Sequence, residues 1–517
     1  MQDLARRLAL LVLSTALGWR PTSRRMAAPR IVMSALSPPR HVVMKFGGSS
    51  VANAERVSHV AELIASQMAE EGTLPAVVLS AMGKTTNCII AAGERALEGR
   101  VDVSEIRSLH LESLAALELP ISTGAEVRGL LRDLESLLDG VSMVRELTPR
   151  TKDLIVSFGE RMSCRVLAAT LSKIGVPAVP CDAWTLGVRT KGMFGDSVVD
   201  EACYPEVARS ISDLFSQGQV PIVTGFIGHD ADGRVATLGR GGSDLTATVL
   251  GAAFGFDEVQ VWKDVDGMMT ADPRVVRAAL PVPFVTYEEA AELAYFGAQV
   301  LHPISMQPAL RAGVPVRVKN SYNPTHCGTL IAEEATIKER RSVAPLVTAI
   351  TSKRHVTVID VVSLRMLGSH GFLARVFDVL ARDRVSVDVV ATSEVSVSLS
   401  LDEEQSLSPA ALEELSEIAQ VELKHDRSIV SFVGDGSRST ELIAQVFAVL
   451  AANDLRVEMI SQGASKVNVA IVVQDDQAEL ALNLIHGCFF GAPLPATCGG
   501  LAVGELAPGL NASAVAA

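Results

Sequence analysis

The sequence has few aromatic residues and no cysteine pattern that would bind a metal. Phenylalanine, tryptophan and tyrosine make up 4% of its 517 residues. Its seven cysteines include no C-x-x-C pair and no zinc-like spacing, which argues against a zinc finger or a thioredoxin-type motif. Because the cysteines are scattered and odd in number, they are typical of reduced thiols rather than of a disulfide framework.

The chain also lacks an excess of basic residues. Its 46 lysines and arginines are outnumbered by 59 acidic residues, and the formal net charge of −13 argues against a nucleic-acid partner. Beyond the first forty residues no apolar run is long enough to span a membrane, so we expect no membrane partner. A hydrophobic content of 48% over this length is sufficient for three or four domains.

The first forty residues differ in charge from the rest. Residues 1–40 hold seven arginines and one acid, a charge of +6, which leaves −13 − 6 = −19 for the remainder. Arginine-rich, acid-poor leaders are typical of organelle transit peptides, and the apolar run from Leu8 to Trp19 adds a signal-like core. We expect residues 1–40 to be a targeting peptide for a plastid, with a mitochondrial or cytoplasmic location as the alternative.

A predicted strand near the start leads directly into a lysine and two glycines, in HVVMKFGGSS at His41–Ser50. The apolar residues predict a buried strand. Gly47, Gly48 and Ser49 then place bare backbone amides beside Lys45, which suits a nucleoside triphosphate. The alternative is a purely structural strand–Gly–Gly turn. Two later stretches favour a function: the glycine loop LGRGGSDLTATVL (238–250) and the charged loop in VWKDVDGMMTADPR (261–274).

Apolar and amphipathic segments alternate between residues 41 and 332. AVVLS, LIVSF, VPIVTGF and VQVW predict buried strands at 76–80, 154–158, 220–226 and 259–262. This alternation predicts an α/β fold, with a parallel-rich sheet between layers of helices. We place a catalytic domain at 41–340 and expect its end, EEATIKERR, to be a linker or boundary helix.

The last third of the chain contains an internal repeat. VFDVLARDRVSVDVV (376–390) aligns with VFAVLAANDLRVEMI (446–460) at an offset of 70 residues. Each copy predicts an amphipathic helix and then an apolar strand with an acid at its third position. The pattern resembles paired ACT modules, which are βαββαβ ferredoxin-like domains that bind small amino acids. We place them at 353–424 and 425–500, with the strand at 347–351 joining the second and 501–517 as a tail; a dimerisation scaffold is the alternative.

Four motifs in order, MKFGGSS, SFGER, LGRGGSD and TADPR, resemble those of the aspartate kinases of the amino-acid kinase superfamily. The resemblance runs from about His41 to about Gly491. It implies ATP-dependent phosphorylation of L-aspartate to 4-phospho-L-aspartate, with Mg²⁺ entering as MgATP and no metal ligands of the protein's own. This reaction opens the route to lysine, threonine, methionine and isoleucine. Another kinase of the superfamily, or a non-catalytic amino-acid sensor, is the alternative.

The resemblance also implies roles for individual residues. Lys45 would offset charge on the transferred phosphoryl group and Asp244 would orient it; no base is needed, because the β-carboxylate of aspartate is already anionic. Further ATP contacts would be Gly47, Gly48, Ser49, Ser80, Lys263, Asp264 and Arg274. Substrate contacts would be Thr86, Glu160, Arg240 and Ser243.

Several of these residues have a structural alternative. Glu160 would grip the substrate's ammonium group just after a predicted strand, but it would also suit a helix start. Arg240 would pair with the substrate carboxylate. Thr86 would equally cap a helix, and Arg274 would equally form a surface ion pair. Gln299 replaces a lysine found in many bacterial members, as it does in plant-like ones, which leaves its role in nucleotide binding open.

The repeats predict regulation by a small amino acid. The residues that match those of lysine-sensitive aspartate kinases are Met366, Ser369, Phe372, Val387, Asp388, Ser393 and Glu394. Asp388 and Glu394 are acids able to hold an ammonium group, so we expect lysine to inhibit the enzyme. Threonine is the alternative effector, and S-adenosylmethionine a possible additional one. Because paired modules expose sheet edges that need covering, we also expect at least a homodimer.

Overall fold

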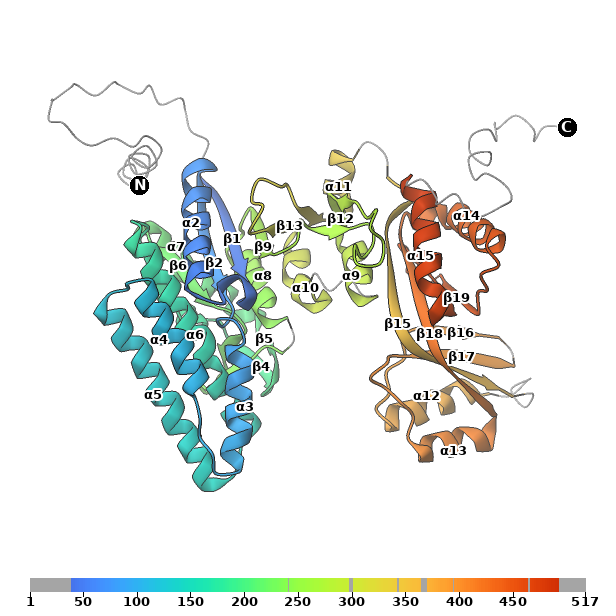
Figure 1. Cartoon of the computed structure of the whole chain (residues 1–517), viewed down its shortest axis with the longest axis horizontal. Coiled ribbons are helices and arrows are strands. Elements are labelled where there is room, and N and C mark those ends of the chain that lie inside the picture. The colour runs from blue at the N-terminus through green and yellow to red at the C-terminus, as the bar shows by residue number, and fades with distance from the viewer. Residues whose placement is uncertain are drawn as a thin grey trace, which may run out of the picture. The chain divides into compact units, whose positions relative to one another are not determined.

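The computed structural model describes residues 39–239, 241–296, 301–341, 344–363, 370–393, 395–463 and 465–491 (Figure 1). The chain forms two compact units. The first comprises residues 1–267 and 300–337, and the second comprises 268–299 and 338–517. None of the helices in these described ranges is both long and apolar enough to cross a membrane.

A mostly parallel sheet forms the centre of the first unit. Among the described residues of this unit its strand order is β14-β13-β9-β1-β2-β6-β3, and only the β13–β14 pair is antiparallel. The strands are β1 (Arg40–Phe46), β2 (Thr73–Leu79), β3 (Ala178–Cys181), β6 (Val220–Thr224), β9 (Glu258–Lys263), β13 (Val316–Asn320) and β14 (Thr329–Ala332). The predicted parallel-rich sheet is confirmed, with strands at three of the four predicted places besides β1.

Helices pack against both faces of this sheet. Val42, Met44 and Phe46 of β1 point into the core formed with one helix group: α2 (Ala54–Glu70), α3 (Thr85–Leu97), α4 (Ser104–Ala116), α5 (Ile121–Val144) and α6 (Pro149–Lys173). Because side chains alternate along a strand, Lys45 points to the other face. There α8 (Gly242–Phe254) packs on β1 and β9, and α7 (Tyr204–Ser216) and α10 (Pro303–Ala312) pack on α8.

The predicted strand at 154–158 is wrong, because these residues lie inside helix α6. The Thr148 side chain caps this helix by accepting the Thr151 N–H, and Pro149 occupies its first position, where proline is favoured. All residues from Ile155 to Glu160 are buried, since α6 packs between other helices and the sheet. A helix enclosed in this way reads as a continuous apolar run, which sequence periodicity does not distinguish from a buried strand.

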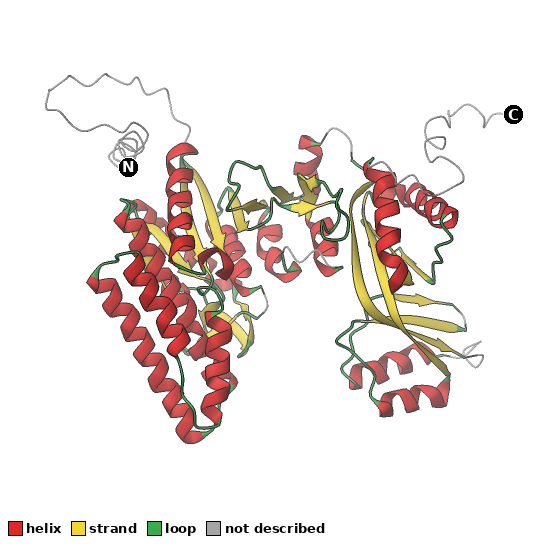
Figure 2. Ribbon diagram, in the orientation of Figure 1, coloured by secondary structure: helices red, strands yellow, loops and turns green. Residues whose placement is uncertain are grey.

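The second unit contains an antiparallel sheet of order β16-β17-β15-β18-β20-β19. Two long strands, β15 (Val347–Val362) and β18 (Gln420–Gly434), run through its middle (Figure 2). The others are β16 (Val390–Thr392), β17 (Ser396–Leu401), β19 (Met459–Gln462) and β20 (Asn468–Gln474). The strand predicted around Asp388 therefore begins only at Val390, and Asp388 lies in the turn before it.

Each repeat packs its own pair of helices against this sheet. Helices α12 (Phe372–Arg382) and α13 (Pro409–Ile418) pack on the far half of β15 and on β17. Helices α14 (Ser439–Ala452) and α15 (Asp475–Phe490) pack on β18 and β20. Val347 and Ile350, at the start of β15, belong to the core of α14 and α15.

A segment from within the range assigned to the catalytic domain also belongs to the second unit. It contains β10 (Met268–Met269), β11 (Pro281–Val282), β12 (Phe284–Thr286) and α9 (Tyr287–Tyr295). The Ile350 N–H donates to the Thr270 carbonyl at 2.7 Å, and the Thr348 hydroxyl donates to Glu289 at 2.6 Å. The Thr270 hydroxyl lies 2.8 Å from Nε2 of His486. These bonds attach the segment to β15 and α15.

Candidate active site

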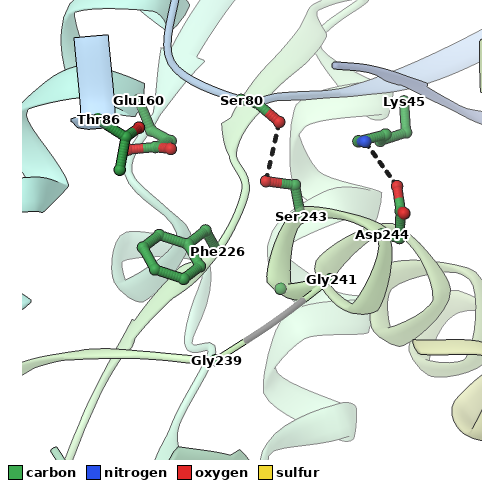
Figure 3. A pocket seen from close by; sticks show the side chains of 10 residues that line it. Lys45, Ser80, Thr86, Glu160, Phe226, Gly239, Gly241, Ser243 and Asp244 are labelled. Carbon is green, nitrogen blue, oxygen red and sulfur yellow. Dashed lines mark hydrogen bonds and ion pairs between the residues drawn. The ribbon is translucent and has the colours of Figure 1, made fainter. Parts of the chain in front are cut away.

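A pocket of about 290 Å³ opens in the first unit where β1, β2 and β6 end and α8 begins (Figure 3). In open α/β sheets ligands bind at the carboxyl ends of the strands. The pocket is lined by Lys45, Ser80, Thr86, Glu160, Phe226, Gly239, Gly241, Gly242, Ser243 and Asp244. Six of these residues were predicted as site residues.

A buried ion pair lies at one end of the pocket. Lys45, the second-last residue of β1, places its Nζ 2.5 Å from Oδ1 of Asp244, in the first turn of α8. The two residues are 7% and 9% exposed. Asp244 also suits the positive end of the helix dipole. The pair holds a cation next to a helix N-terminus, which is a site that attracts phosphate groups.

The turn after β1 brings the backbone close to its neighbours. Gly48 accepts the Gly83 N–H at 3.0 Å, and a Cβ on Gly48 would lie 2.7 Å from the Ala81 carbonyl oxygen. Any side chain at this position would therefore force the two loops apart. Gly47, Gly48 and Ser49 adjoin the pocket through Lys45 but do not line it.

A hydrogen bond between two serines joins the sheet to α8. Ser80 directly follows β2, and its hydroxyl donates to the Ser243 hydroxyl at 3.0 Å (Figure 3). Gly225 leaves room for Ser243, because a Cβ there would lie 2.7 Å from the Ser243 side chain. The bond fixes the first turn of α8, and with it Asp244, against the end of β2.

Glu160 lies at the other end of the pocket, beside Thr86 (Figure 3). It is 2% exposed and comes from the middle of α6, so both expectations, a position after a strand and one at a helix start, are wrong. Its Oε1 accepts the Ala81 N–H at 3.2 Å, whereas its buried Oε2 has no hydrogen-bond partner among the described residues. Burial raises the pKa of Glu160 to about 8, against the lowering effect of backbone hydrogen bonds.

A small residue lets α6 approach the loop after β2. A Cβ on Gly159 would lie 2.8 Å from the Ala81 Cβ. In that loop Lys84, rather than a threonine, is the N-cap residue of α3, and the Thr85 hydroxyl donates to the Met82 carbonyl at 2.6 Å. Thr86 therefore does not cap the helix and lines the pocket instead.

One lining side chain, Phe226, is not among the residues predicted from the sequence. It follows β6 and has a φ of 72°, a left-handed backbone conformation that is rare for a bulky residue. The Thr246 hydroxyl accepts its N–H at 3.0 Å, and Gly242 packs against it so closely that a Cβ there would lie 2.6 Å from the ring. A phenylalanine gives no sign of a chemical role in a sequence. Its position just after the strand in VTGF is the only sequence feature that could have indicated it.

The remaining predicted residues of the active site differ in their placement. Lys263 ends β9, and its pKa is lowered by burial, while the nearby Asp244 raises it. Asp264 follows Lys263 directly. Arg274 lies in the second unit and is 87% exposed at its side chain, where it pairs with Asp272 at 2.7 Å, as the surface-pair interpretation expects. Arg240 and Gln299 lie outside the described residues.

The predicted effector residues are in the second unit. Phe372 begins α12, and both Phe372 and Val387 pack against the core of the first repeat. The Ser393 hydroxyl lies 2.7 Å from that of Ser396. Asp388 already has two partners: its Oδ1 accepts the Tyr295 hydroxyl, and its Oδ2 accepts the Lys353 ammonium, both at 2.7 Å. Met366, Ser369 and Glu394 lie outside the described residues.

No cluster of three or more His, Cys, Asp or Glu side chains able to hold a metal occurs in the described part of the chain. Of the two carboxylates that line the pocket, Asp244 lies next to Lys45 and Glu160 lies at the other end. Magnesium is commonly held by one or two carboxylates together with substrate phosphates. The donor set therefore fits a magnesium ion that arrives with a nucleotide.

Comparisons with known proteins agree on one family. Residues 40–320 match the amino acid kinase family, and residues 430–489 match an ACT domain. The chain is 49% identical to the chloroplastic aspartokinase 3 of Arabidopsis thaliana, over 87% of this chain and 81% of that protein. It is 36% identical to the lysine-sensitive aspartokinase 3 of Escherichia coli, over 87% and 99%.

The fold also matches solved structures. E. coli aspartokinase III in complex with aspartate and ADP has a TM-score of 0.71 at 35% identity, covering 87% of this chain and 99% of that one. The same enzyme in complex with lysine and aspartate has a TM-score of 0.72 at the same identity and coverage.

Proposed function

The chain belongs to the aspartokinases of the amino acid kinase family, and from that premise we propose that the pocket between Lys45 and Glu160 binds aspartate and the terminal phosphate of ATP. The enzyme converts L-aspartate and ATP to 4-phospho-L-aspartate and ADP. The observation that carries the assignment is one pocket with a buried cation at one end and a buried, half-satisfied carboxylate at the other.

In the reaction, one oxygen of the substrate's β-carboxylate attacks the γ-phosphorus of ATP. A new O–P bond forms, the bond from phosphorus to the β,γ-bridging oxygen breaks, and ADP leaves with the electron pair. No proton is transferred, so the protein supplies position and charge. Lys45 offsets the charge that develops on the transferred group, and the amides at the start of α8 face the same region.

Asp244 holds Lys45 in place and is the carboxylate that would contact a magnesium ion carried by ATP. Such an ion would supply positive charge that offsets the charge of the phosphates. We assign the rest of the phosphate chain and the nucleoside to the motif residues of the first unit, which are Gly47, Gly48, Ser49, Ser80, Lys263 and Asp264. Arg274 is left out, because it forms an exposed pair with Asp272 in the second unit.

Glu160 binds the α-ammonium group of aspartate. Its Oε2 faces no other partner among the described residues, and an ammonium group would satisfy it. Because an adjacent positive charge favours the ionised carboxyl, substrate binding lowers the pKa of Glu160 from about 8. The site therefore takes up the substrate with loss of a proton at neutral pH. Thr86, Ser243 and Arg240 complete the substrate contacts in this assignment.

Regulation by lysine is the second part of the proposal. The E. coli relative is named as lysine-sensitive and has been solved with lysine bound. In this chain the Asp388 side chain is 5% exposed and already binds a cation, the ammonium group of Lys353. We place the effector at the residues of the first repeat named above. An inhibitor bound there acts by favouring an inactive arrangement, so lysine and aspartate oppose each other's binding.

The assembly and location of the enzyme are also proposals. Paired modules of this kind need their sheet edges and helix faces covered, which favours a homodimer or larger assembly. A monomeric mass in light scattering at micromolar concentration would contradict this. The Arabidopsis relatives are named as chloroplastic, and residues 1–40 have the composition of a transit peptide. A plastid location is tested by whether residues 1–40 carry a fluorescent protein into plastids.

The direct test of the activity is a hydroxamate assay, in which hydroxylamine traps an acyl phosphate. The chain lacking residues 1–40 is expected to form aspartyl hydroxamate from MgATP and aspartate. It should form none from glutamate or acetylglutamate, whose longer carbon chains move the reacting carboxylate. Binding of MgATP without acyl phosphate from aspartate would contradict the function.

Replacing the cation should remove turnover without unfolding the protein. Lys45→Met is expected to lower kcat by about 10²–10³-fold, because the lost charge acts on the transition state. Circular dichroism and thermal unfolding should show an intact fold. As a control, Lys191→Met removes an exposed lysine of the same unit that pairs with Asp200 at 3.7 Å, and it should leave kcat unchanged. Lys45→Met activity within threefold of wild type would remove Lys45 from the mechanism.

Removing the acid of the effector site should reduce lysine sensitivity. Asp388→Ala is expected to raise the lysine concentration for half-inhibition at least about tenfold, because it removes one charge-assisted hydrogen bond to the ammonium group of the effector. Initial rates with lysine, threonine and S-adenosylmethionine measure this. Inhibition of the wild type by threonine but not by millimolar lysine would mean that the site is assigned to the wrong amino acid.

A further inference from the structure

A buried aspartate on α6, two turns before Glu160, holds the loop that forms another wall of the pocket. Asp153 is 2% exposed. Its Oδ2 accepts the backbone N–H groups of Gly195 and Thr237 at 2.9 and 2.8 Å. Its Oδ1 accepts the Thr237 hydroxyl at 2.9 Å. Three donors from two separate segments of the chain thus converge on one carboxylate.

Both partners of Asp153 adjoin the pocket-lining loop. Thr237 ends β8 (Val235–Thr237), and Gly239 lines the pocket two residues later. Gly195 lies in the turn between β4 (Thr190–Met193) and β5 (Asp196–Val199). That turn packs tightly on the loop, because a Cβ on Gly239 would lie 2.5 Å from Oδ1 of Asp196. Asp153 therefore fixes the loop and also the turn that supports it.

We propose that Asp153 is a positioning residue for aspartate binding, acting through Thr237 on the two residues that follow it, Leu238 and Gly239. One helix then sets both sides of the substrate site: α6 carries Glu160 into the pocket directly and holds the facing loop through Asp153. This proposal deepens the proposed function and depends on it. It predicts an effect on aspartate that is not shared by ATP, which a general loss of stability would not produce.

The test compares Michaelis constants for the two substrates. Asp153→Asn replaces an acceptor oxygen by an NH₂ group that faces N–H donors, so the loop shifts. The KM for aspartate is expected to rise at least about tenfold, since small displacements of positioning groups are costly, while the KM for ATP stays within about threefold. Thr237→Val removes only the hydroxyl donor and should raise the aspartate KM less, and Thr237→Ser keeps that donor and is the matched control.

Equal changes in both Michaelis constants, or no change in either, would overturn the role of Asp153. If Asp153→Asn does not fold, the comparison of Thr237→Val with Thr237→Ser decides alone: equal aspartate KM values in those two variants overturn the proposal. Failure of the proposed function is distinct, because the wild type would then form no acyl phosphate from aspartate.

A second inference comes from the second unit, where the chain supplies its own ammonium group to Asp388. The Nζ of Lys353, on β15, lies 2.7 Å from Oδ2 of Asp388 and 2.9 Å from Oδ2 of Asp402. The Tyr295 hydroxyl occupies Oδ1 of Asp388 at 2.7 Å, and Lys353 lies 5.3 Å from the centre of the Tyr295 ring. Both oxygens of this buried carboxylate are therefore in use.

The internal cation carries the same chemical group as the proposed effector. In the second repeat, Glu458 lies 70 residues after Asp388 and likewise pairs with a cation of the chain, Arg427, at 3.0 Å. Of these two equivalent ion pairs, the one in the first repeat has lysine as its cation. A free amino acid that brings an ammonium group to Asp388 competes with Lys353 for one carboxylate.

We infer that Lys353 is an internal competitor of the effector and that lysine binds by displacing it from Asp388. Tyr295 ends α9, and the next residue, Phe296, packs in a core with Val356 and Val358 of β15. Displacement of Lys353 also removes its contact with the Tyr295 ring, so effector binding alters the surroundings of α9. The inference rests on the proposed regulation by lysine.

Removing the competitor should increase sensitivity. If Lys353 occupies Asp388 in about nine-tenths of molecules, the apparent affinity of the effector is reduced about tenfold. Lys353→Met is expected to lower the lysine concentration for half-inhibition at least about fivefold and to enlarge the lysine-induced rise in Tm. Asp402 is 41% exposed, and Asp402→Asn removes one of the two ion pairs of Lys353 while Lys353 can still pair with Asp388. This variant should also lower the lysine concentration for half-inhibition, but by less than Lys353→Met.

The matched control is Lys424→Met, which breaks a lysine–aspartate pair of 2.8 Å with Asp360 in the same sheet and should leave lysine sensitivity unchanged. The competition would be overturned if lysine inhibits the wild type but neither Lys353→Met nor Asp402→Asn is more sensitive to lysine than the wild type. Should Lys353→Met not fold, Asp402→Asn decides. Absence of lysine binding to the wild type and to every variant would overturn the regulation itself and the competition with it.

Discussion

A carboxyl group buried without a full set of partners is the constraint on which the active site depends. Glu160 has one oxygen satisfied by the Ala81 N–H and one oxygen that meets no partner among the described residues. A buried charge of this kind is costly unless an opposite charge accompanies it, so burial raises the pKa of Glu160. The ammonium group of aspartate removes that cost, which makes the substrate itself the missing partner.

The rest of the first unit serves to place this group opposite a cation. Parallel strands β1, β2 and β6 end at one edge of the sheet, and α8 starts there. This arrangement alone brings Lys45, Ser80, Ser243 and Asp244 together. Helix α6 then crosses the sheet and contributes Glu160 and Asp153, seven residues apart on the same helix. In the second unit, Lys353 of the same chain offsets the charge of Asp388, and the Tyr295 hydroxyl donates a hydrogen bond to it.

Motifs at strand ends could be predicted from the sequence, because glycines and charged residues after an apolar run have few structural uses. The sheet, the Lys45 turn and the start of α8 were found in this way. The strand at 154–158 was wrong, since a fully enclosed helix has no polar face to reveal its period. Phe226 was missed because it is apolar. The partners of Asp388 were missed because Lys353 and Tyr295 lie 35 and 93 residues away in sequence.

The most direct test of the central claim is the number of protons released when aspartate binds. Isothermal titration calorimetry at pH 7, repeated in buffers of different ionisation enthalpy, measures it. A Glu160 carboxyl with a pKa of about 8 is protonated in most free molecules at pH 7 and ionised beside the ammonium group, so more than about half a proton should be released per aspartate. Glu160→Gln, which keeps the acceptor for Ala81, should release none. Binding of aspartate without proton release in the wild type, or with equal release in both proteins, would contradict the account.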